Sequence, residues 1–348
     1  MNKNIAIVIL NYNGKQHLQQ FLPSVIQHSK LANCKIIVAD NASTDDSTQY
    51  LQENFANQIE LIVLDKNYGF AEGYNRALQQ IKSDYYILLN SDVEVTANWI
   101  SPVIDYIEQD DLMVAAQPKL LAYHNKKEFE YAGAAGGFID KYGYPFCRGR
   151  IFNTCEVENG QYNQNSEIFW ASGACLFIKA DAFHLVGGFD GDFFAHMEEI
   201  DLCWRLKNLG YKIGYCANST VFHVGGGTLH KSNPKKTYLN FRNNRALLRK
   251  NLSGIELSGI YKMRNRLDKI AWLKSLLTNK DESKAIKKAL ADYNDMIDDL
   301  NNKKIAFQKI QQQNAVAQPN KHGIYNSSIV VDYYIKQKKL FSQLNFNI

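Results

Sequence analysis

The 348-residue sequence has no apolar run long enough to cross a membrane. A transmembrane helix needs about 20 consecutive apolar residues. The apolar stretch nearest the start, residues 5–10, reads only IAIVIL. It is also too short, and wrongly flanked, to form the core of a secretory signal peptide. We therefore expect a cytoplasmic protein that is not integral to the membrane.

Cysteine is scarce, and its spacing excludes a zinc or disulfide framework. The six cysteines are at positions 34, 147, 155, 175, 203 and 216, with no C-x-x-C pair among them. A zinc site would need closely spaced pairs, and a disulfide scaffold would need a short, cysteine-rich chain. Several of these cysteines lie in apolar runs. We predict that they are reduced core residues.

The glycine-rich loops of common nucleotide-binding folds are missing as well. A Rossmann dinucleotide site needs G-x-G-x-x-G after the first strand, and a P-loop has its own glycine-rich signature. The segment after the first apolar run reads NYNGKQ, with a single glycine. Nicotinamide-dependent and ATP-hydrolysing enzymes are therefore disfavoured. A nucleotide here would have to be held by side chains and a metal ion.

What the sequence does contain is a regular alternation of apolar runs and helical segments. Strands are predicted at 5–11, 35–40, 59–65, 84–90 and 112–120, and helices after the first four, including 43–55 and 70–81. Residues 121–165 are irregular, and 167–180 is strand-like. Continuous apolar strands between helices indicate an α/β fold whose central sheet is mostly parallel and is covered by helices on both faces.

Polar residues follow four of these strands, at the sheet edge where ligands bind in such folds. They are Asn11-Tyr12, Asp40-Asn41, Asn67 and Asn90-Ser91-Asp92. Asn and Asp are also common in turns, so a single such end is ordinary. Four together indicate a site, in which Asp92 could bind a divalent cation that bridges two phosphates. Asp40 is placed to accept hydrogen bonds from a base or ribose.

Two later motifs add titratable groups. The segment HMEEIDLCWRL contains Glu198, Glu199 and Asp201. Clustered carboxylates can raise one another's pKa, which suits a general base, although acidic residues also favour the N-terminus of any helix. His223 lies in VFHVGGG, where the glycines would let the backbone approach a ligand. It is a candidate metal ligand or a structural histidine.

Taken in order, these blocks resemble the inverting family 2 glycosyltransferases with the GT-A fold, and in particular the rhamnosyltransferase-like bacterial members. The blocks are IAIVILNYNG, VADNASTD, LDKNYGFAEGYNRAL, LLNSD, FWASGACLFIKADAFHLVGGFD, MEEIDLCWRLKNLGY and VFHVGGGT, within roughly residues 4–250. The resemblance implies a nucleotide-diphosphate sugar donor, a divalent cation (Mn²⁺ or Mg²⁺) and inversion at the anomeric carbon. It also implies a glycan or lipid-linked acceptor, in the synthesis of cell-surface polysaccharide.

The same resemblance implies how the donor is held. Asn90-Ser91-Asp92 stands where the family has its D-x-D metal motif, so Asp92 would be the main protein ligand of the cation. His223 would complete the metal or pyrophosphate site. The donor would also be bound by Asn11, Tyr12, Asp40, Asn41, Asn67 and Asn75. A catalytically inactive protein that only binds a carbohydrate or nucleotide sugar is the alternative with the same fold.

For the acceptor side, the resemblance implies a base and a binding surface. Glu199 stands at the second position of the family's Glu-Asp pair, where the base is usually Asp, so Glu198 stays open as the alternative. Residues implied to border the acceptor are Trp170, Ser172, Gly173 and Asp201. Trp170 is the candidate for stacking on a sugar ring.

Charge divides the chain into two parts. Residues 1–230 contain 17 Lys and Arg against 26 Asp and Glu, whereas residues 231–348 contain 23 against 9. We expect a catalytic domain at 1–240, made of a nucleotide-binding half (1–120) and an acceptor half (121–240). A basic, helical extension would follow at 241–348. No nucleic-acid-binding signature is found in it, so we expect no nucleic-acid partner.

The extension includes a candidate amphipathic helix at 258–277. Apolar residues at helical spacing are Ile260, Met263, Leu267, Ile270 and Leu277, and basic residues around them are Lys262, Arg264, Arg266, Lys269 and Lys274. Such a helix either packs on the catalytic domain or lies on an anionic membrane surface, or does both with different faces.

Overall fold

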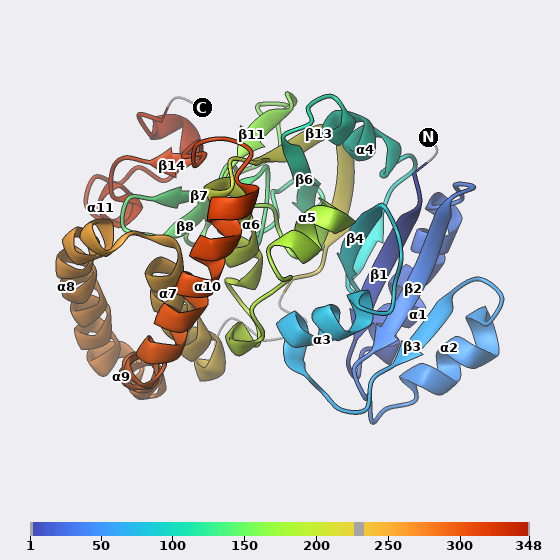
Figure 1. Cartoon of the computed structure of the whole chain (residues 1–348), viewed down its shortest axis with the longest axis horizontal. Coiled ribbons are helices and arrows are strands. Elements are labelled where there is room, and N and C mark those ends of the chain that lie inside the picture. The colour runs from blue at the N-terminus through green and yellow to red at the C-terminus, as the bar shows by residue number, and fades with distance from the viewer. Residues whose placement is uncertain (1–2, 226–232, 347–348) are drawn as a thin grey trace.

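The computed structural model describes residues 3–225 and 233–346 (Figure 1). Its central sheet consists of β1 (Ile5–Asn11), β2 (Cys34–Asp40), β3 (Glu60–Val63), β4 (Tyr85–Asn90), β5 (Val93–Val95), β6 (Met113–Ala122), β11 (Ser166–Ile168), β12 (Cys175–Lys179) and β13 (Lys212–His223). The order is β11-β13-β6-β12-β4-β1-β2-β3, and β5 pairs with β13.

The N-terminal half of this sheet is parallel, as predicted. β1 pairs in parallel with both β2 and β4, and β2 with β3, whereas β12 is antiparallel to its two neighbours. The chain steps outward from β1 to β3 and then returns to place β4 on the other side of β1. This reversal is the position at which open α/β sheets bind ligands.

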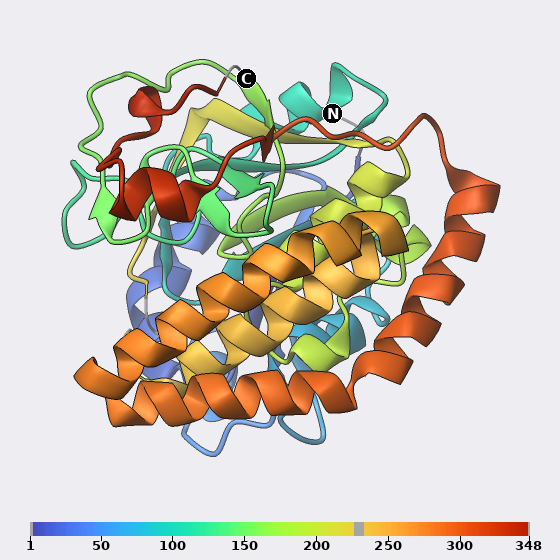
Figure 2. The ribbon, with the colours of Figure 1, turned by 90° about the vertical axis from the view of Figure 1, so that its left-hand side faces the viewer.

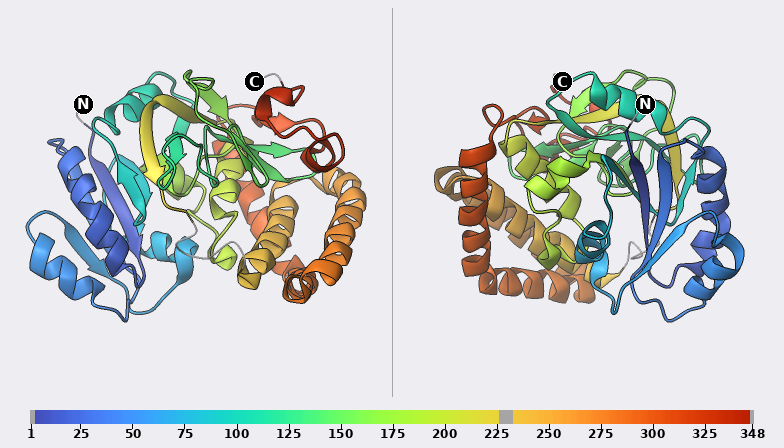
Figure 3. Two further views of the ribbon diagram at one scale, coloured as in Figure 1. Left: turned by 180° about the vertical axis from the view of Figure 1, so that it is seen from behind. Right: turned by 45° about the vertical axis from the view of Figure 1, so that its right-hand side comes forward.

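Helices cover both faces of the sheet because its strands are apolar on both sides. Ile5, Ile7 and Ile9 face one core, whereas Ala6 and Val8 face the other. The first core is covered by α1 (Lys15–His28), α2 (Ser47–Phe55) and α4 (Ser101–Glu108) (Figure 3). The second is covered by α3 (Gly69–Leu78), α5 (Ala180–Leu185) and α6 (Glu198–Asn208). The predicted fold class is thereby confirmed.

A smaller sheet joins residues 137–155 to the end of the chain. Its strands are β7 (Gly137–Asp140), β8 (Pro145–Cys147), β9 (Arg150–Ile151), β10 (Thr154–Cys155) and β14 (Ile324–Tyr325), in the order β10-β9-β8-β7-β14. β14 pairs in parallel with β7, with Ile324 opposite Ile139. The C-terminal region thus supplies an edge strand to a sheet built mainly from residues 137–155.

The remaining C-terminal elements are helical. They are α7 (Pro234–Asn251), α8 (Gly254–Thr278), α9 (Lys280–Asp295), α10 (Ile297–Asn314) and α11 (Ile329–Tyr334). Figure 2 shows α9 along the lower side of α7 and α8, with α10 rising at the edge. α7 contacts α6, which begins at Glu198. Within residues 3–225 and 233–346, no helix combines the length and apolar composition needed to span a bilayer.

Two predicted element boundaries were wrong. The helix predicted at 43–55 begins only at Ser47. The Ser43 hydroxyl instead accepts hydrogen bonds from the Asn11 side chain and the Asn13 backbone, at the end of β1. The strand predicted at 167–180 is two strands, β11 and β12, separated by the small residues around Ser172 and Gly173. In both cases the residues that leave regular structure lie at the strand-end site described below.

The amphipathic pattern of α8 holds only for part of the helix. Ile260, Met263 and Leu267 are half-buried against the body, whereas Ile270 and Leu277 are 61% and 90% exposed. Arg264, predicted to be a surface cation, is buried. It pairs with Asp268, which also receives two bonds from Arg245 of α7. This buried cluster ties α8 to α7.

Candidate active site

The sheet brings three of the predicted strand ends together. Asn11 of β1 lies opposite Asp40 of β2, and Leu10 lies opposite Asn90 of β4. Because β1 lies between β2 and β4, side chains from all three ends meet at the reversal point of the sheet. Tyr12, immediately after β1, is 48% exposed at this edge.

The Asn11–Asp40 pair is buried and organised. The Asn11 amide donates to an Asp40 carboxylate oxygen at 2.9 Å, and the Ser43 backbone N–H donates to the other at 2.8 Å. The Oδ1 atom of Asn11 is buried with no hydrogen-bond partner among the described residues. A buried acceptor without a partner is costly, so this atom is a place where a ligand donor would be stabilised.

Asn41 and Asn67 shape the loop between β3 and α3. The Asn41 amide donates to Asn67 Oδ1 (3.1 Å) and to the Gly69 carbonyl (2.9 Å), and its oxygen accepts from Tyr68 N. Asn41 is buried and Asn67 exposed, so Asn67 is the one of the two that can reach a ligand. Asn75 was expected to bind the donor, but it exchanges two hydrogen bonds with the backbone of Phe189. It therefore anchors the loop that contains Phe189.

A buried histidine is held between two carboxylates. His223 Nε2 lies 3.2 Å from Asp92 Oδ1, and its Nδ1 lies 3.3 Å from Glu130 Oε1. All three side chains are less than a tenth exposed. The pairing of β5 with β13 sets His223 opposite Val93, and Val224 N donates to the Asp92 carbonyl. The sequence prediction that Asp92 and His223 belong to one site agrees with this placement.

Glu130 was missed by sequence reasoning. It lies in the irregular segment after β6, which backbone bonds such as Glu130 N to the Leu120 carbonyl and Ala122 N to the Glu128 carbonyl fold back along the strand. Its second carboxylate oxygen accepts from Ala132 N at 2.5 Å. No local motif marks it, because its partner is almost a hundred positions away. The expected role of the glycines at 226 and 227 lies outside the described residues.

The protonation of His223 and of Asp92 depends on this arrangement. Burial alone would lower the pKa of His223, but Asp92 and Glu130 overcome it and raise the pKa to about 10. Burial would likewise raise the pKa of Asp92, yet the nearby imidazolium lowers it. In the absence of a metal ion the site therefore holds an imidazolium between two carboxylates.

A carboxylate and an imidazole suit Mn²⁺ or a similar ion. Among the described residues, no group of three or more His, Cys, Asp or Glu side chains is arranged to hold a metal alone. A cation bound by Asp92 and His223 Nε2 would take its other ligands from phosphate oxygens and water, as Mg²⁺ and Mn²⁺ sites in phosphate-handling enzymes do. The residues present fit such a cation, with Glu130 orienting the imidazole from its other nitrogen.

The second carboxylate centre begins α6. Glu198 is buried, Glu199 is half-buried, and each has one carboxylate oxygen enclosed without a hydrogen-bond partner in the described structure. Burial raises the pKa of Glu199 to about 7. Burial, and then the charge of Glu199, raises the pKa of Glu198 well above its usual value. Glu199 is therefore poised to exchange a proton near neutral pH.

Gly173 and Ala174 lie between the two centres. The Ala174 carbonyl accepts from Asn90 N at 3.0 Å. A Cβ added at Gly173 would lie 3.8 Å from Cβ of Glu199 and 3.5 Å from the Phe70 ring. The strand end that carries Asp92 and the helix that carries Glu199 are thus joined through two small residues.

Three of the residues expected to border the acceptor are buried and hydrogen-bonded within the protein. Trp170 is buried and donates from Nε1 to the Phe138 carbonyl, so its expected stacking on a sugar is corrected. Asp201 is fully buried and is bound by Arg205, Lys250 and Asn251, which leaves it no acceptor surface. Ser172 is also buried; its hydroxyl donates to the Ala132 carbonyl, in the segment that carries Glu130.

The fold is that of the GT-A glycosyltransferases. The family model for "Glycosyl transferase family 2" matches residues 6–184, just over half of the chain. The protein therefore belongs to glycosyl transferase family 2, as the sequence blocks indicated.

Similar proteins agree with this assignment. The chain is 26% identical over 239 residues to "N-acetylglucosaminyl-diphospho-decaprenol L-rhamnosyltransferase" of Mycobacterium tuberculosis, covering 64% of this chain and 76% of that protein. In structure it resembles S. aureus TarS 1–349, solved with UDP-GlcNAc (TM-score 0.54, 14% identity, covering 93% and 99% of the two chains). It also resembles a mannosyltransferase from Pyrobaculum calidifontis solved with GDP-Man and Mn²⁺ (TM-score 0.52, 12% identity, covering 90% and 88%).

Replacing Glu130 with glutamine tests the histidine site directly. Removing one of the two carboxylates weakens the attraction for the imidazolium, so the pKa of His223 should fall from about 10. The measurement is an NMR titration of the histidine ring protons in chelator-treated protein, with His223→Ala used to assign the signal. Glu94→Gln, which removes a more exposed carboxylate paired with Lys126, is the matched control. An unchanged His223 titration in Glu130→Gln would contradict this site.

Proposed function

We propose that this protein transfers a sugar from a nucleotide-diphosphate donor to a hydroxyl group of a glycan or lipid-linked acceptor, with inversion at the anomeric carbon and with a divalent cation. Rhamnose or another hexose is the proposed sugar. The observation that carries this proposal is the pair of carboxylate centres on either side of Gly173 and Ala174. One suits a cation and phosphates, and the other suits a proton acceptor.

The donor would lie across the strand ends. Asp40 and the Asn11 oxygen would bind the base or ribose, with Tyr12 and Asn67 at the edge of that site and Asn41 holding Asn67 in place. Asp92 and His223 would hold the cation, and Asn90 and Ser91 border the same strand end. A bound Mn²⁺ or Mg²⁺ would neutralise the negative charge that grows on a departing diphosphate.

Glu199 is the proposed base. Its raised pKa lets it accept a proton from the acceptor hydroxyl at neutral pH, while that oxygen attacks the anomeric carbon from the face opposite the leaving group. Formation of the new C–O bond and loss of the diphosphate then invert the configuration. The acceptor would lie beside Glu199 near Gly173, where an added Cβ would be 3.8 Å from Cβ of Glu199.

Replacing Glu199 with glutamine should lower turnover about 10²–10⁴-fold, the usual contribution of a positioned base. Donor affinity should be kept, because Glu199 lies apart from the proposed phosphate site. The assay measures sugar transfer and release of nucleoside diphosphate from a panel of dTDP-, UDP- and GDP-sugars with Mn²⁺. Glu198→Gln is the matched comparison, and a larger loss in that variant would move the base to Glu198.

The pH dependence follows from the same group. A base acts only when deprotonated, so turnover of the wild-type protein should rise with pH through about 7, the pKa of Glu199. A rate profile flat between pH 5.5 and 8.5 would contradict the assignment. A wild-type protein that binds a donor yet never releases nucleoside diphosphate would instead be the inactive binding protein.

Removing the Asp92 carboxylate tests the donor and metal half of the site. Asp92→Ala should weaken binding of Mn²⁺ and of the productive nucleotide sugar by at least about 10–100-fold, by analogy with lost metal-site ligands and their partners. Calorimetry measures both affinities, and Asp111→Ala, which removes an exposed carboxylate, is the control. Unchanged donor affinity in Asp92→Ala would place the phosphates elsewhere.

We further propose that the protein works at the cytoplasmic face of an anionic membrane. The support is the outer face of α8. Exposed apolar residues recur there at helical spacing, namely Ile270, Leu273, Leu276 and Leu277. Exposed basic residues lie among them, namely Lys262, Arg266, Lys269 and Lys274. Apolar residues among cations are complementary to an anionic lipid surface, and a lipid-linked acceptor would be presented there.

Replacing Ile270 and Leu277 together with serine should weaken binding to phosphatidylglycerol vesicles about 10-fold or more, because two apolar side chains no longer enter the bilayer. Vesicle sedimentation at low salt measures the binding, and phosphatidylcholine vesicles test the charge requirement. Ile335→Ser removes an equally exposed apolar residue outside α8 and serves as the control. Equal binding of wild type and the double variant would exclude this face.

A further inference from the structure

The segment that leads into the proposed base has a strained backbone. Phe194, His196 and Met197 have φ values of 62°, 69° and 74°. Non-glycine residues rarely adopt this left-handed conformation, which persists only where the surroundings hold it. Met197 is the N-cap of α6, so the strain lies directly before Glu198 and Glu199. We call residues 186–197 the base loop.

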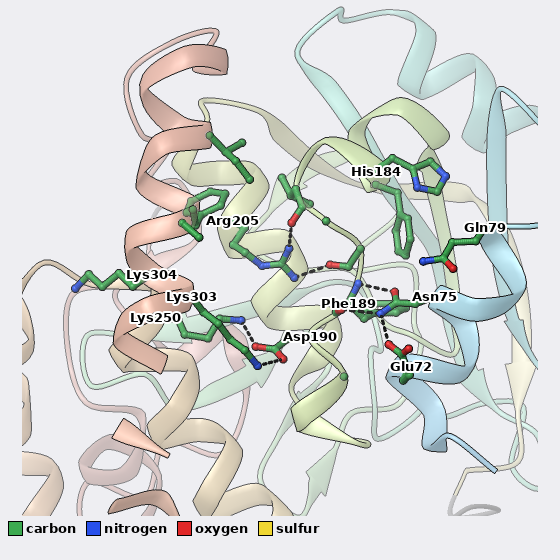
Figure 4. Close-up of a pocket in the computed structure, with 18 residues that line it drawn as sticks. Glu72, Asn75, Gln79, His184, Phe189, Asp190, Arg205, Lys250, Lys303 and Lys304 are labelled. Carbon is green, nitrogen blue, oxygen red and sulfur yellow. Dashed lines mark hydrogen bonds and ion pairs between the residues drawn. The ribbon is translucent and has the colours of Figure 1, made fainter. Parts of the chain in front are cut away.

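The base loop is held from several sides. Arg205 of α6 donates to the carbonyls of Val186 and Gly188, and Asn75 of α3 binds the backbone of Phe189 (Figure 4). Lys250 of α7 and Lys303 of α10 both bind Asp190, at 2.6 and 2.9 Å. The pocket of about 510 Å³ shown in Figure 4 lies against this part of the loop.

One side chain holds the strained end of the loop. Asn243 of α7 is 1% exposed, and its amide nitrogen donates to the carbonyls of Phe193, Ala195 and His196 at 2.9, 2.9 and 2.8 Å. An amide has two N–H groups, so the three carbonyls share them. From the other side, the Phe194 carbonyl accepts from Phe70 N and Ala71 N at the start of α3.

We propose that Asn243 is a positioning residue for the transfer reaction: it fixes the left-handed turn of the base loop and thereby sets where Glu199 stands at the start of α6. On this proposal α7 completes the active site by holding the base loop. Three carbonyl oxygens directed at one point repel one another unless a donor lies between them, and the Asn243 amide supplies that donor. This inference rests on the proposed function where it concerns rate.

The adjacent residue provides a matched control. Asn244 is also buried, at 3% exposure, on the same helix, and its amide nitrogen donates to the Gly143 carbonyl, outside the base loop. Asn243→Ala and Asn244→Ala therefore both delete a buried amide from α7, but only the first releases the loop. Arg242→Ala removes bonds to the carbonyls of Asp192 and Phe193 from a half-buried position. It is the milder variant to use if Asn243→Ala does not fold.

Hydrogen exchange, read by mass spectrometry on the full-length protein without substrate, tests the loop itself. Amides of residues 191–201 should exchange about 10-fold faster in Asn243→Ala than in Asn244→Ala, because the turn opens locally. In kinetics, Asn243→Ala should lower kcat about 10²-fold with an unchanged KM for the donor, the effect expected of a base misplaced by about 1 Å. The acid limb of its pH profile should move to lower pH, because water reaches Glu199.

The outcomes separate the two proposals. Exchange equal in the two alanine variants overturns the positioning role, as does faster exchange with kcat and acid limb unchanged. If the wild-type protein consumes no nucleotide sugar at all, the proposed function fails, and the exchange measurement alone then decides whether Asn243 holds the loop.

Discussion

The site depends on the antiparallel pairing of β5 with β13. That pairing places His223 beside Asp92, and a third chain segment places Glu130 behind the imidazole. An imidazolium between two buried carboxylates compensates charges that could not be buried singly. The same arrangement sets the Asp92 carboxylate and the Nε2 atom of His223 beside each other just after the end of β4. The pairing of β5 with β13 therefore both completes this part of the sheet and brings His223 and Asp92 together.

The sequence predicted the fold because the relevant signals are local. Apolar runs such as 5–11 and 84–90 are buried on both faces, and the helices between them were found with boundaries close to those observed. The positions of Asn11, Asp40 and Asp92 at the strand ends could be predicted for the same reason, since parallel strands must end at one edge; their role in a site stays a prediction. The family assignment, carried by ordered blocks, agrees with the family model over residues 6–184.

What the sequence could not predict depends on long-range contacts. Glu130 has no motif, and its role follows only from a backbone return along β6. Trp170 and Asp201 fit an acceptor surface by position in the chain, yet one is enclosed by the small sheet and the other by Lys250 and Arg205. Arg264 looked like a surface cation until Asp268 and α7 enclosed it. Burial of a polar side chain cannot be read from its neighbours in sequence.

The pairing of β14 with β7 has a consequence for synthesis of the chain. β7 has no partner on this edge until β14, which pairs Ile324 with Ile139, has been synthesised. On the ribosome, the N-terminal half can collapse around its parallel strands long before that partner emerges. The exposed edge of β7 is meanwhile open to pairing with other chains. Completion of the molecule is therefore a late event, and a nascent chain stalled before residue 324 would be prone to aggregate.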